Sequence, residues 1–179
     1  GGAPSTAWEN AIDYFIANAG GAGQPLNGGL VVFAAGNSNS QTTGAYPGNY
    51  APVVAVASTT FNATRSSFSN YGTWVDIAAP GSNILSTYPV SQGSYNTISG
   101  TSMACPHVSG VAALVASKYW RDGNPLTAAQ LRNILESTAN FNLLYDANTS
   151  TYDGKLGAGM LDAYAALGGT GSGGGGNGC

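Results

Sequence analysis

Residues 99–110 read SGTSMACPHVSG, in which a turn that contains glycine leads directly into an apolar stretch. Apolar residues continue at helical spacing as far as Val115, which predicts a buried helix over residues 101–119 at the centre of the molecule. Pro106 is compatible with this helix because it falls in the first turn. Ser102 then lies at the helix N-terminus, where unpaired backbone N–H groups and the helix dipole stabilise a nearby negative charge.

Upstream of this helix, apolar stretches of strand length alternate with turn residues. Residues 30–35 read LVVFAA, a continuous apolar run that is typical of a strand covered on both faces of a parallel sheet. Residues 53–57 and 74–78 indicate two shorter strands. Apolar positions at helical spacing predict an amphipathic helix over residues 5–18. This order of helix and strands predicts an α/β fold with a mostly parallel sheet.

Two helices carry start signals. Thr6 and Glu9 fit a capping box at the start of the first helix, and Thr127 and Gln130 fit a second one further along the chain. A short helix is expected over residues 161–167. The glycine-rich stretch that follows cannot bury apolar surface and is expected to be a flexible linker. The expected division is a domain over residues 1–167 and a linker or tail over 168–179.

The composition excludes several classes of function. Only 7% of the residues are charged, against a usual share of about a quarter. The net charge is −3 and the five basic residues are scattered, so nucleic acid is not an expected partner. The chain has no apolar run long enough for a membrane span. Two cysteines and one histidine do not support a metal cluster. A polar but weakly charged surface fits a protein that works outside the cell or on its surface.

The stretch at residues 99–110 closely resembles the nucleophile motif of the subtilisin family of serine proteases, and further segments follow that family's order over nearly the whole chain. These segments are GGAPS at 1–5, AAGN at 34–37, YPGNY at 46–50, FSNYG at 68–72 and DIAAPG at 76–81. The resemblance implies the C-terminal half of the family's catalytic domain. It also implies a three-layer fold with a mostly parallel sheet and a central buried helix after the nucleophile.

For function, the resemblance implies peptide-bond hydrolysis through an acyl-enzyme on Ser102. The Asn37 side-chain amide and the Ser102 backbone N–H would hold the oxyanion of the tetrahedral intermediate. The implied substrates are proteins or peptides, and no cofactor is required. Taken alone, an asparagine after a strand would more simply cap a loop. The combination of Asn37 with the Ser102 motif favours the catalytic role.

A general base for Ser102 is not evident. His107, the only histidine, lies five residues further along the same helix, about 140° around the axis from Ser102. In the family this histidine is structural, and the catalytic Asp and His come earlier, in glycine-containing segments that have no counterpart among these residues. We therefore expect the chain alone to be inactive, with the N-terminal half of the same catalytic domain as its partner.

Three other interpretations stay open at the level of the sequence, and the third is a bare structural fragment whose sheet edges and apolar faces would be exposed without the central strands of the N-terminal half. The first is a non-catalytic, subtilase-like pseudoenzyme or binding module, which the absent base and the glycine-rich stretch would fit. The second is a relative of the sedolisins, which place an Asp at the oxyanion position. Asn37 and the MACPH sequence after Ser102 argue against the second interpretation.

The resemblance also places substrate-binding residues. It puts the walls of the primary substrate pocket at Ala34, Ala35 and Gly36 and its floor near Ala45, with Thr101 next to the nucleophile. None of these residues is charged. A pocket lined by small uncharged groups is expected to accept apolar or aromatic side chains.

A cation site is the remaining expectation. The backbone carbonyls of Gly48, Tyr50 and Val53 match a position where some family members hold Ca²⁺ or a monovalent cation together with the carboxylate at Asp76. Trp74 stands where some members have a second carboxylate. Because Ca²⁺ prefers several oxygen ligands, this difference counts against a Ca²⁺ site. The simpler interpretation is that Asp76 caps a turn.

Overall fold

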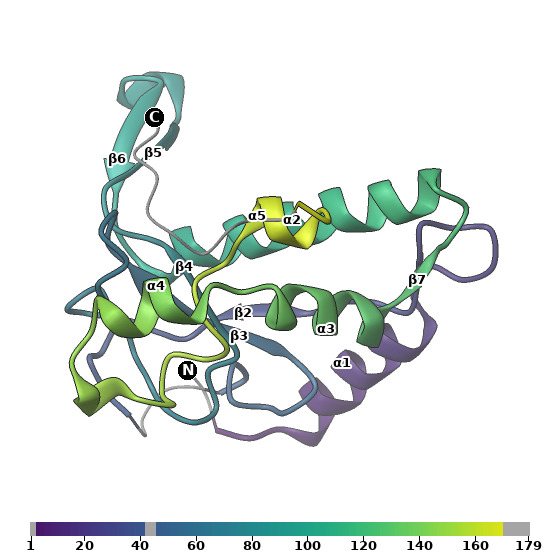
Figure 1. Cartoon of the computed structure of the whole chain (residues 1–179), viewed down its shortest axis with the longest axis horizontal. Helices are drawn as coiled ribbons and strands as arrows, with labels where there is room; N and C mark the ends of the chain where they lie inside the picture. The colour runs from purple at the N-terminus through teal and green to yellow at the C-terminus, as the bar shows by residue number, and fades with distance from the viewer. Residues whose placement is uncertain (1–2, 42–45, 170–179) are drawn as a thin grey trace.

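The centre of the molecule is a parallel sheet of three strands in the order β2-β3-β4 (Figure 1). The computed structural model describes residues 3–41 and 46–169. All six residues of β3 are buried, whereas β2 is half-buried and, within the described residues, is paired on one side only. The strands are β2 (Val32–Ala34), β3 (Val54–Thr59) and β4 (Ile77–Pro80). The expected parallel α/β arrangement is confirmed.

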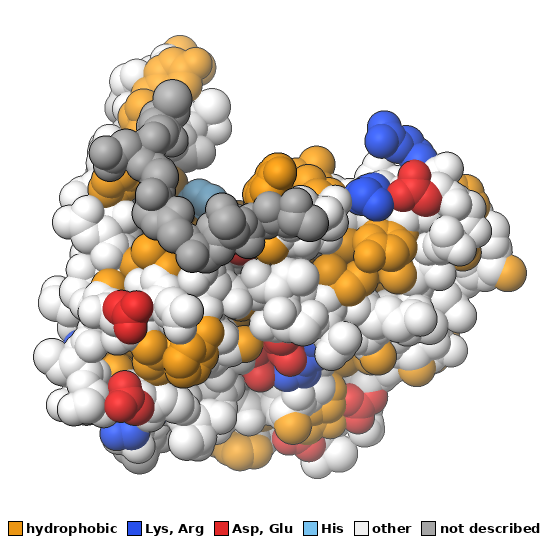
Figure 2. Space-filling model, in the orientation of Figure 1, with side chains coloured by type: hydrophobic (Ala, Val, Ile, Leu, Met, Phe, Trp, Pro, Cys, Tyr) orange, Lys and Arg blue, Asp and Glu red, His pale blue; other side chains and the backbone are white. Residues whose placement is uncertain are grey.

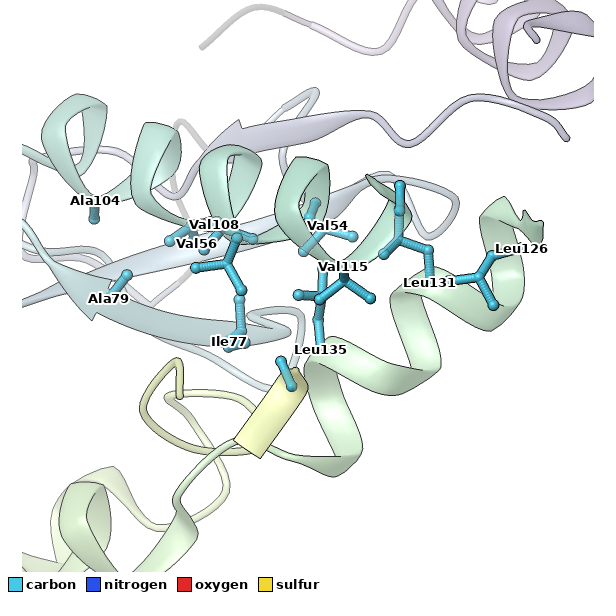
Figure 3. Close-up of a cluster of buried hydrophobic side chains, with 14 residues drawn as sticks. Val54, Val56, Ile77, Ala79, Ala104, Val108, Val115, Leu126, Leu131 and Leu135 are labelled. Carbon is cyan, nitrogen blue, oxygen red and sulfur yellow. The ribbon is translucent and has the colours of Figure 1, made fainter. Parts of the chain in front are cut away.

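The long helix α2 (Thr101–Arg121) packs across this sheet, as its apolar spacing predicts. Val108 and Val115 of α2 are completely buried, in a cluster shared with the sheet and with helix α3 (Ala128–Ser137). Other members that Figure 3 labels are Val54, Val56, Ile77, Leu131 and Leu135. The helix that begins at the predicted nucleophile is therefore anchored in the larger of the two clusters of buried apolar residues in the described part of the chain.

Helix α1 (Thr6–Asn18) lies on the other face of β2. Side chains alternate along a strand, so Val32 packs against the α2 cluster while Phe33 lines an apolar groove beside α1. This groove has a volume of about 440 Å³ and is also lined by Trp8 and Phe15 of α1. Helices thus cover both faces of the sheet, which is the three-layer arrangement expected from the resemblance.

An antiparallel hairpin, β5 (Ile84–Thr87) and β6 (Tyr95–Ile98), projects from the body of the molecule just before α2 (Figure 1). A 3-10 turn over Val90–Gln92 lies at its tip. Leu85 and Tyr95 are 68% and 65% exposed, so no core packing supports this pair of strands. The sequence does not predict the hairpin because its strands lack a buried apolar face.

Residues 155–161 return to the sheet beside β4 and act almost as a further strand. Ala78 donates its N–H to the Gly159 carbonyl at 3.0 Å, and the Leu161 N–H is donated to the Ala78 carbonyl at 2.8 Å. Leu156 and Met160 are buried in a second apolar cluster. Gly157 has a φ of +83°, and a Cβ placed there would lie 2.2 Å from the Asp76 carbonyl carbon, so only glycine fits.

The remaining elements show where sequence patterns succeed and fail. The capping box at Thr127 and Gln130 is confirmed, with the Gln130 N–H donated to Thr127 Oγ1 at 3.2 Å. The box expected at Thr6 is wrong, because Ser5 is the N-cap residue and Thr6 already lies inside α1. The short elements are β1 (Leu26–Asn27), β7 (Leu126–Thr127), α4 (Phe141–Asp146), a 3-10 turn (Ser150–Tyr152) and α5 (Ala163–Ala166). Helix α5 matches the short final helix.

The surface agrees with the low charge of the sequence. Charged side chains are sparse on the face in Figure 2, and most of that face consists of uncharged groups. No helix in the described part of the chain is long and apolar enough to cross a membrane. Residues 170–179 lie outside the described residues, so the expected linker stays a prediction.

Candidate active site

Asn37 and Thr101 join the end of β2 to the start of α2. The Asn37 Oδ1 atom accepts hydrogen bonds from the Thr101 backbone N–H and from Thr101 Oγ1, both at 2.9 Å. Thr101 Oγ1 in turn accepts the Gly36 N–H at 3.1 Å. Because these bonds occupy Oδ1, the orientation of the amide is fixed, and its Nδ2 atom is turned away from Thr101 and donates to no described residue. That atom lies beside Gly100, 3.5 Å from where a Cβ would stand.

Ser102 is exposed in the first turn of α2. The Thr101 N–H is donated to Asn37, and the Met103 N–H is donated to the Gly100 carbonyl at 2.9 Å. The Ser102 N–H has no acceptor within the helix because it belongs to the first turn. Two donors, the Ser102 N–H and the Asn37 side-chain amide, are therefore available next to the Ser102 hydroxyl for an oxygen that gains negative charge.

The electrostatics of α2 favour an anion at the same end. The helix has 21 residues and no acidic residue in its first turn, while Lys118 and Arg121 lie in its last turn. The positive end of its dipole therefore faces the Ser102 side chain without a competing carboxylate. This arrangement can stabilise the tetrahedral intermediate of an acyl transfer.

His107 serves the helix rather than Ser102. Its Nδ1 atom lies 2.8 Å from the Met103 carbonyl one turn earlier in α2. Within residues 3–41 and 46–169, the Ser102 hydroxyl is hydrogen-bonded to neither a histidine nor a carboxylate. The structural role expected for His107 agrees with this contact.

The expected substrate pocket is only partly described. Ala35 is fully buried, and its side chain packs with Ala57 and Leu144, so only its backbone can face a ligand. Ala34 and Gly36 are half-buried, and Gly36 has a φ of +99°. Ala45, the expected floor, lies outside the described residues.

The expected cation position is taken by a side chain that sequence reasoning missed. Arg132 donates from Nη2 to Asp76 Oδ1 at 2.7 Å and from Nη1 to the Val53 carbonyl at 3.1 Å. The other oxygen of Asp76 accepts the Ala55 N–H at 2.7 Å. The Tyr50 carbonyl accepts the Val53 N–H at 3.0 Å. These residues do not fit a bound cation, because a guanidinium already uses its two best ligands.

Burial dominates the titration of the Asp76 carboxyl. It raises the pKa of the Asp76 carboxyl above its ordinary value, although the Ala55 N–H and the Arg132 guanidinium act in the opposite direction. Arg132 also contacts Glu136 through Nε at 2.6 Å. An isolated arginine in α3 offers no signal of such a partner, which is why the sequence analysis did not find it.

Comparison with known proteins agrees with this geometry. The subtilase family model matches residues 2–161. An extracellular protease of Xanthomonas campestris is 41% identical over 172 residues, which are 93% of this chain and 27% of that protein. Thermitase of Thermoactinomyces vulgaris is 46% identical over 140 residues, which are 78% of this chain and 44% of that protein. The chain thus spans less than half of either relative.

Solved structures show the same similarity. Proteases from Pseudoalteromonas arctica superpose with a TM-score of 0.75 at 37% sequence identity, over 93% of this chain and 48% of theirs. A cold-adapted subtilisin-like serine proteinase is 49% identical over 64% of this chain, with a TM-score of 0.55. Together with the serine at the start of α2 and the asparagine after β2, these matches show that the chain belongs to the subtilase family.

Proposed function

We propose that this chain is the nucleophile-bearing half of a secreted serine endopeptidase. Ser102 Oγ attacks the carbonyl carbon of the scissile peptide bond to give a tetrahedral intermediate, which collapses to an ester as the C–N bond breaks and the amine leaves. The carbonyl π electrons move onto oxygen, where the Asn37 amide and the Ser102 N–H hold the negative charge. A base supplied by another segment takes the hydroxyl proton and passes it to the leaving amine. Water then hydrolyses the ester.

The observation that carries this proposal is the fixed orientation of Asn37. Two hydrogen bonds from Thr101 hold its Oδ1 atom, so Nδ2 is left as a donor beside the first turn of α2. An asparagine that only capped the loop would not need its amide nitrogen beside the first turn of α2.

The base is proposed to come from the upstream half of the same catalytic domain. Strand β2 is paired on one side only in the described part of the chain. In the groove beside it, the side chains of Trp8 and Phe15 are 58% and 48% exposed. A parallel strand added at this edge would pair the free backbone groups and cover the groove. That strand would bring the segments with the missing His and Asp close to Ser102.

Substrates and location follow the same reasoning. The backbone of residues 34–36 offers no charge, so we propose apolar or aromatic side chains at the primary subsite. Relatives named as extracellular proteases and the weakly charged surface support secretion. A peptide series in which Lys or Glu was preferred at this subsite would contradict the proposed specificity.

Labelling with a fluorophosphonate serine probe tests the function. We expect the complete protein that contains this chain to label, and Ser102→Ala to abolish the label. The chain alone should label poorly because no base is positioned at Ser102. If the complete protein is folded but stays unlabelled, the non-catalytic binding module becomes the better interpretation.

A further inference from the structure

Asn70 is a buried polar residue that the proposed mechanism has not yet used. It is 1% exposed and lies in the turn between β3 and β4, far from α2 in the sequence. Its Oδ1 atom accepts the N–H groups of Ser38 and Ser40 at 3.0 and 3.1 Å. Its Nδ2 atom donates to the Ala35 carbonyl at 2.9 Å, and its backbone N–H donates to the Gly36 carbonyl at 2.8 Å.

These hydrogen bonds lie on both sides of Asn37. Ala35 and Gly36 come directly before it, and Ser38 comes directly after it. Asn37 itself is exposed and so gains little orientation from packing. The Asn70 side chain therefore holds the backbone on both sides of Asn37, together with the Thr101 contact and with the Asn39 N–H, which is donated to the Phe68 carbonyl at 2.8 Å.

Arg65 holds the far end of the same loop. Its guanidinium donates from Nη2 to Asn39 Oδ1 at 2.9 Å and lies 4.9 and 4.4 Å from the ring centroids of Tyr71 and Tyr152. It also donates from Nη1 to the Ser69 carbonyl, next to Asn70. The turn that carries Asn70 is thus tied to the second apolar cluster, which contains Tyr71 and Tyr152 at its margin. Asn70 therefore lies on a rigid turn and can hold the backbone around Asn37 in place.

We propose that Asn70 is a positioning residue for the oxyanion site. It sets the distance between the Asn37 amide and the first turn of α2 and does not touch the substrate. This inference rests on the proposed function. A donor misplaced by about 1 Å can lower a rate by about 10²-fold, because the donor must meet the charge only at the transition state. Loss of Asn70 is therefore expected to affect turnover more than substrate binding.

The test uses the complete protease with Asn70→Ala and the milder Asn70→Ser. Asn148→Ala is the matched control, because its side chain, like that of Asn70, makes hydrogen bonds to three described backbone groups, but it contacts none of the described residues among 35–40. Those partners are the Arg65 N–H and the carbonyls of Ala63 and Leu144. The readouts are kcat, KM, the melting temperature and Ki for a peptide boronic acid, which binds Ser102 Oγ through boron and mimics the tetrahedral intermediate.

We expect Asn70→Ala to lower kcat by about 10- to 100-fold while KM changes by less than about threefold. The boronic acid Ki should rise by a similar factor, with Asn70→Ser between Asn70→Ala and the wild type. Asn148→Ala should lower the melting temperature but leave kcat and Ki within about twofold of the wild type. KM and Ki do not depend on the folded fraction, so poor folding of one variant does not hide the result.

Two results would overturn the role of Asn70 while the wild type remains active. In the first, both Asn70 variants keep the wild-type kcat and Ki. In the second, Asn148→Ala raises Ki as much as Asn70→Ala, which would show that loss of either buried asparagine loosens the fold and that Asn70 has no specific role at the oxyanion site. A folded wild type that neither cleaves peptides nor binds the boronic acid would instead overturn the proposed function, and this inference with it.

Discussion

At the scale of single residues, the two ends of one amide group have different tasks. The side-chain oxygen of Asn37, Oδ1, holds the loop to α2, because it accepts two hydrogen bonds from Thr101. The amide nitrogen is thereby left for chemistry. An aspartate could accept the same two bonds from Thr101, but it could not donate one to an oxyanion.

Replacement of Asn37 by leucine tests this division of tasks. In the complete protease we expect Asn37→Leu to lower kcat strongly and to change KM little, because the donor acts at the transition state. The scale comes from subtilisin itself, where loss of one such side-chain donor costs roughly 10²–10³ in kcat. Ser38→Ala, in the next residue of the loop, is the control because the hydrogen bond that Ser38 makes to a described residue comes from its backbone N–H and not from its side chain. Equal turnover in Asn37→Leu and the wild type would remove the assigned role.

Arg132→Met tests the ion pair at Asp76. The variant keeps an apolar stem but leaves a half-buried carboxylate without its cation, which we expect to cost about 1–3 kcal/mol at neutral pH. In the folded chain the pKa of Asp76 is already raised, so the folded state takes up this proton at a higher pH than the unfolded state. The contribution of Asp76 to the free energy of unfolding therefore falls as the pH rises from the Asp76 pKa of the unfolded chain to that of the folded chain.

Removal of Arg132 raises the pKa of Asp76 in the folded chain further. The difference in free energy of unfolding between the variant and the wild type should therefore be largest at a pH above this pKa, where Asp76 is charged, and should fade at lower pH, where Asp76 is protonated. Urea unfolding at neutral and acidic pH measures this change. We also expect added Ca²⁺ to stabilise Arg132→Met more than the wild type, because the Asp76 and Val53 oxygens become available. A Ca²⁺ response that is larger in the wild type would restore the expected cation site.

The sequence predicted the residues that belong to local motifs and missed those that act across the fold. Ser102 and Asn37 could be proposed because each belongs to a short local motif that resembles a segment of the subtilisin family. Asn70 and Arg132 could not, because their partners are about 30 and more than 50 residues away in the sequence. Nothing in a single sequence states which backbone groups a distant side chain meets.

At the scale of elements, buried elements were predictable and exposed ones were not. Helices α2 and α3 have apolar faces at helical spacing, and both were found. The hairpin of β5 and β6 carries no alternating apolar face, and its burial pattern is almost wholly exposed. Its strands are defined by hydrogen bonds to each other, which leave no trace in hydropathy. Strand β4 was expected over residues 74–78, but a turn in which Val75 N–H is donated to Gly72 delays it to Ile77.

The junction between β4 and residues 155–161 gives a prediction at this scale. Gly157→Ala should destabilise the complete protein more than Gly154→Ala. Both residues have positive φ, but a Cβ at Gly154 meets nothing within 4 Å, whereas one at Gly157 meets the Asp76 backbone. Gly154→Ala is expected to cost about 1–2 kcal/mol from its left-handed backbone alone. Chemical denaturation of both variants checks the difference, and equal losses would show that the junction tolerates a side chain.

At the scale of the whole molecule, an apolar surface is left beside β2. A sheet edge with free N–H and carbonyl groups next to exposed aromatic side chains promotes association of chains. We therefore expect the chain expressed alone to aggregate or to fold only in part, with strong binding of an apolar dye. Co-expression with the upstream half should restore a soluble monomeric complex. A sharp, cooperative melt of the chain alone as a monomer would contradict this prediction.

The return of residues 155–161 to β4 bears on how the protein is made. On the ribosome, β3 and β4 emerge long before Leu156 and Met160, yet these two residues fill the second apolar cluster beside them. Thr59 Oγ1 even bonds to the Met160 sulfur, 101 positions later. Until synthesis has passed Leu161, one face of the nascent sheet stays open to chaperones and proteases. A ribosome that stalls a few codons early would release a chain that cannot close its core.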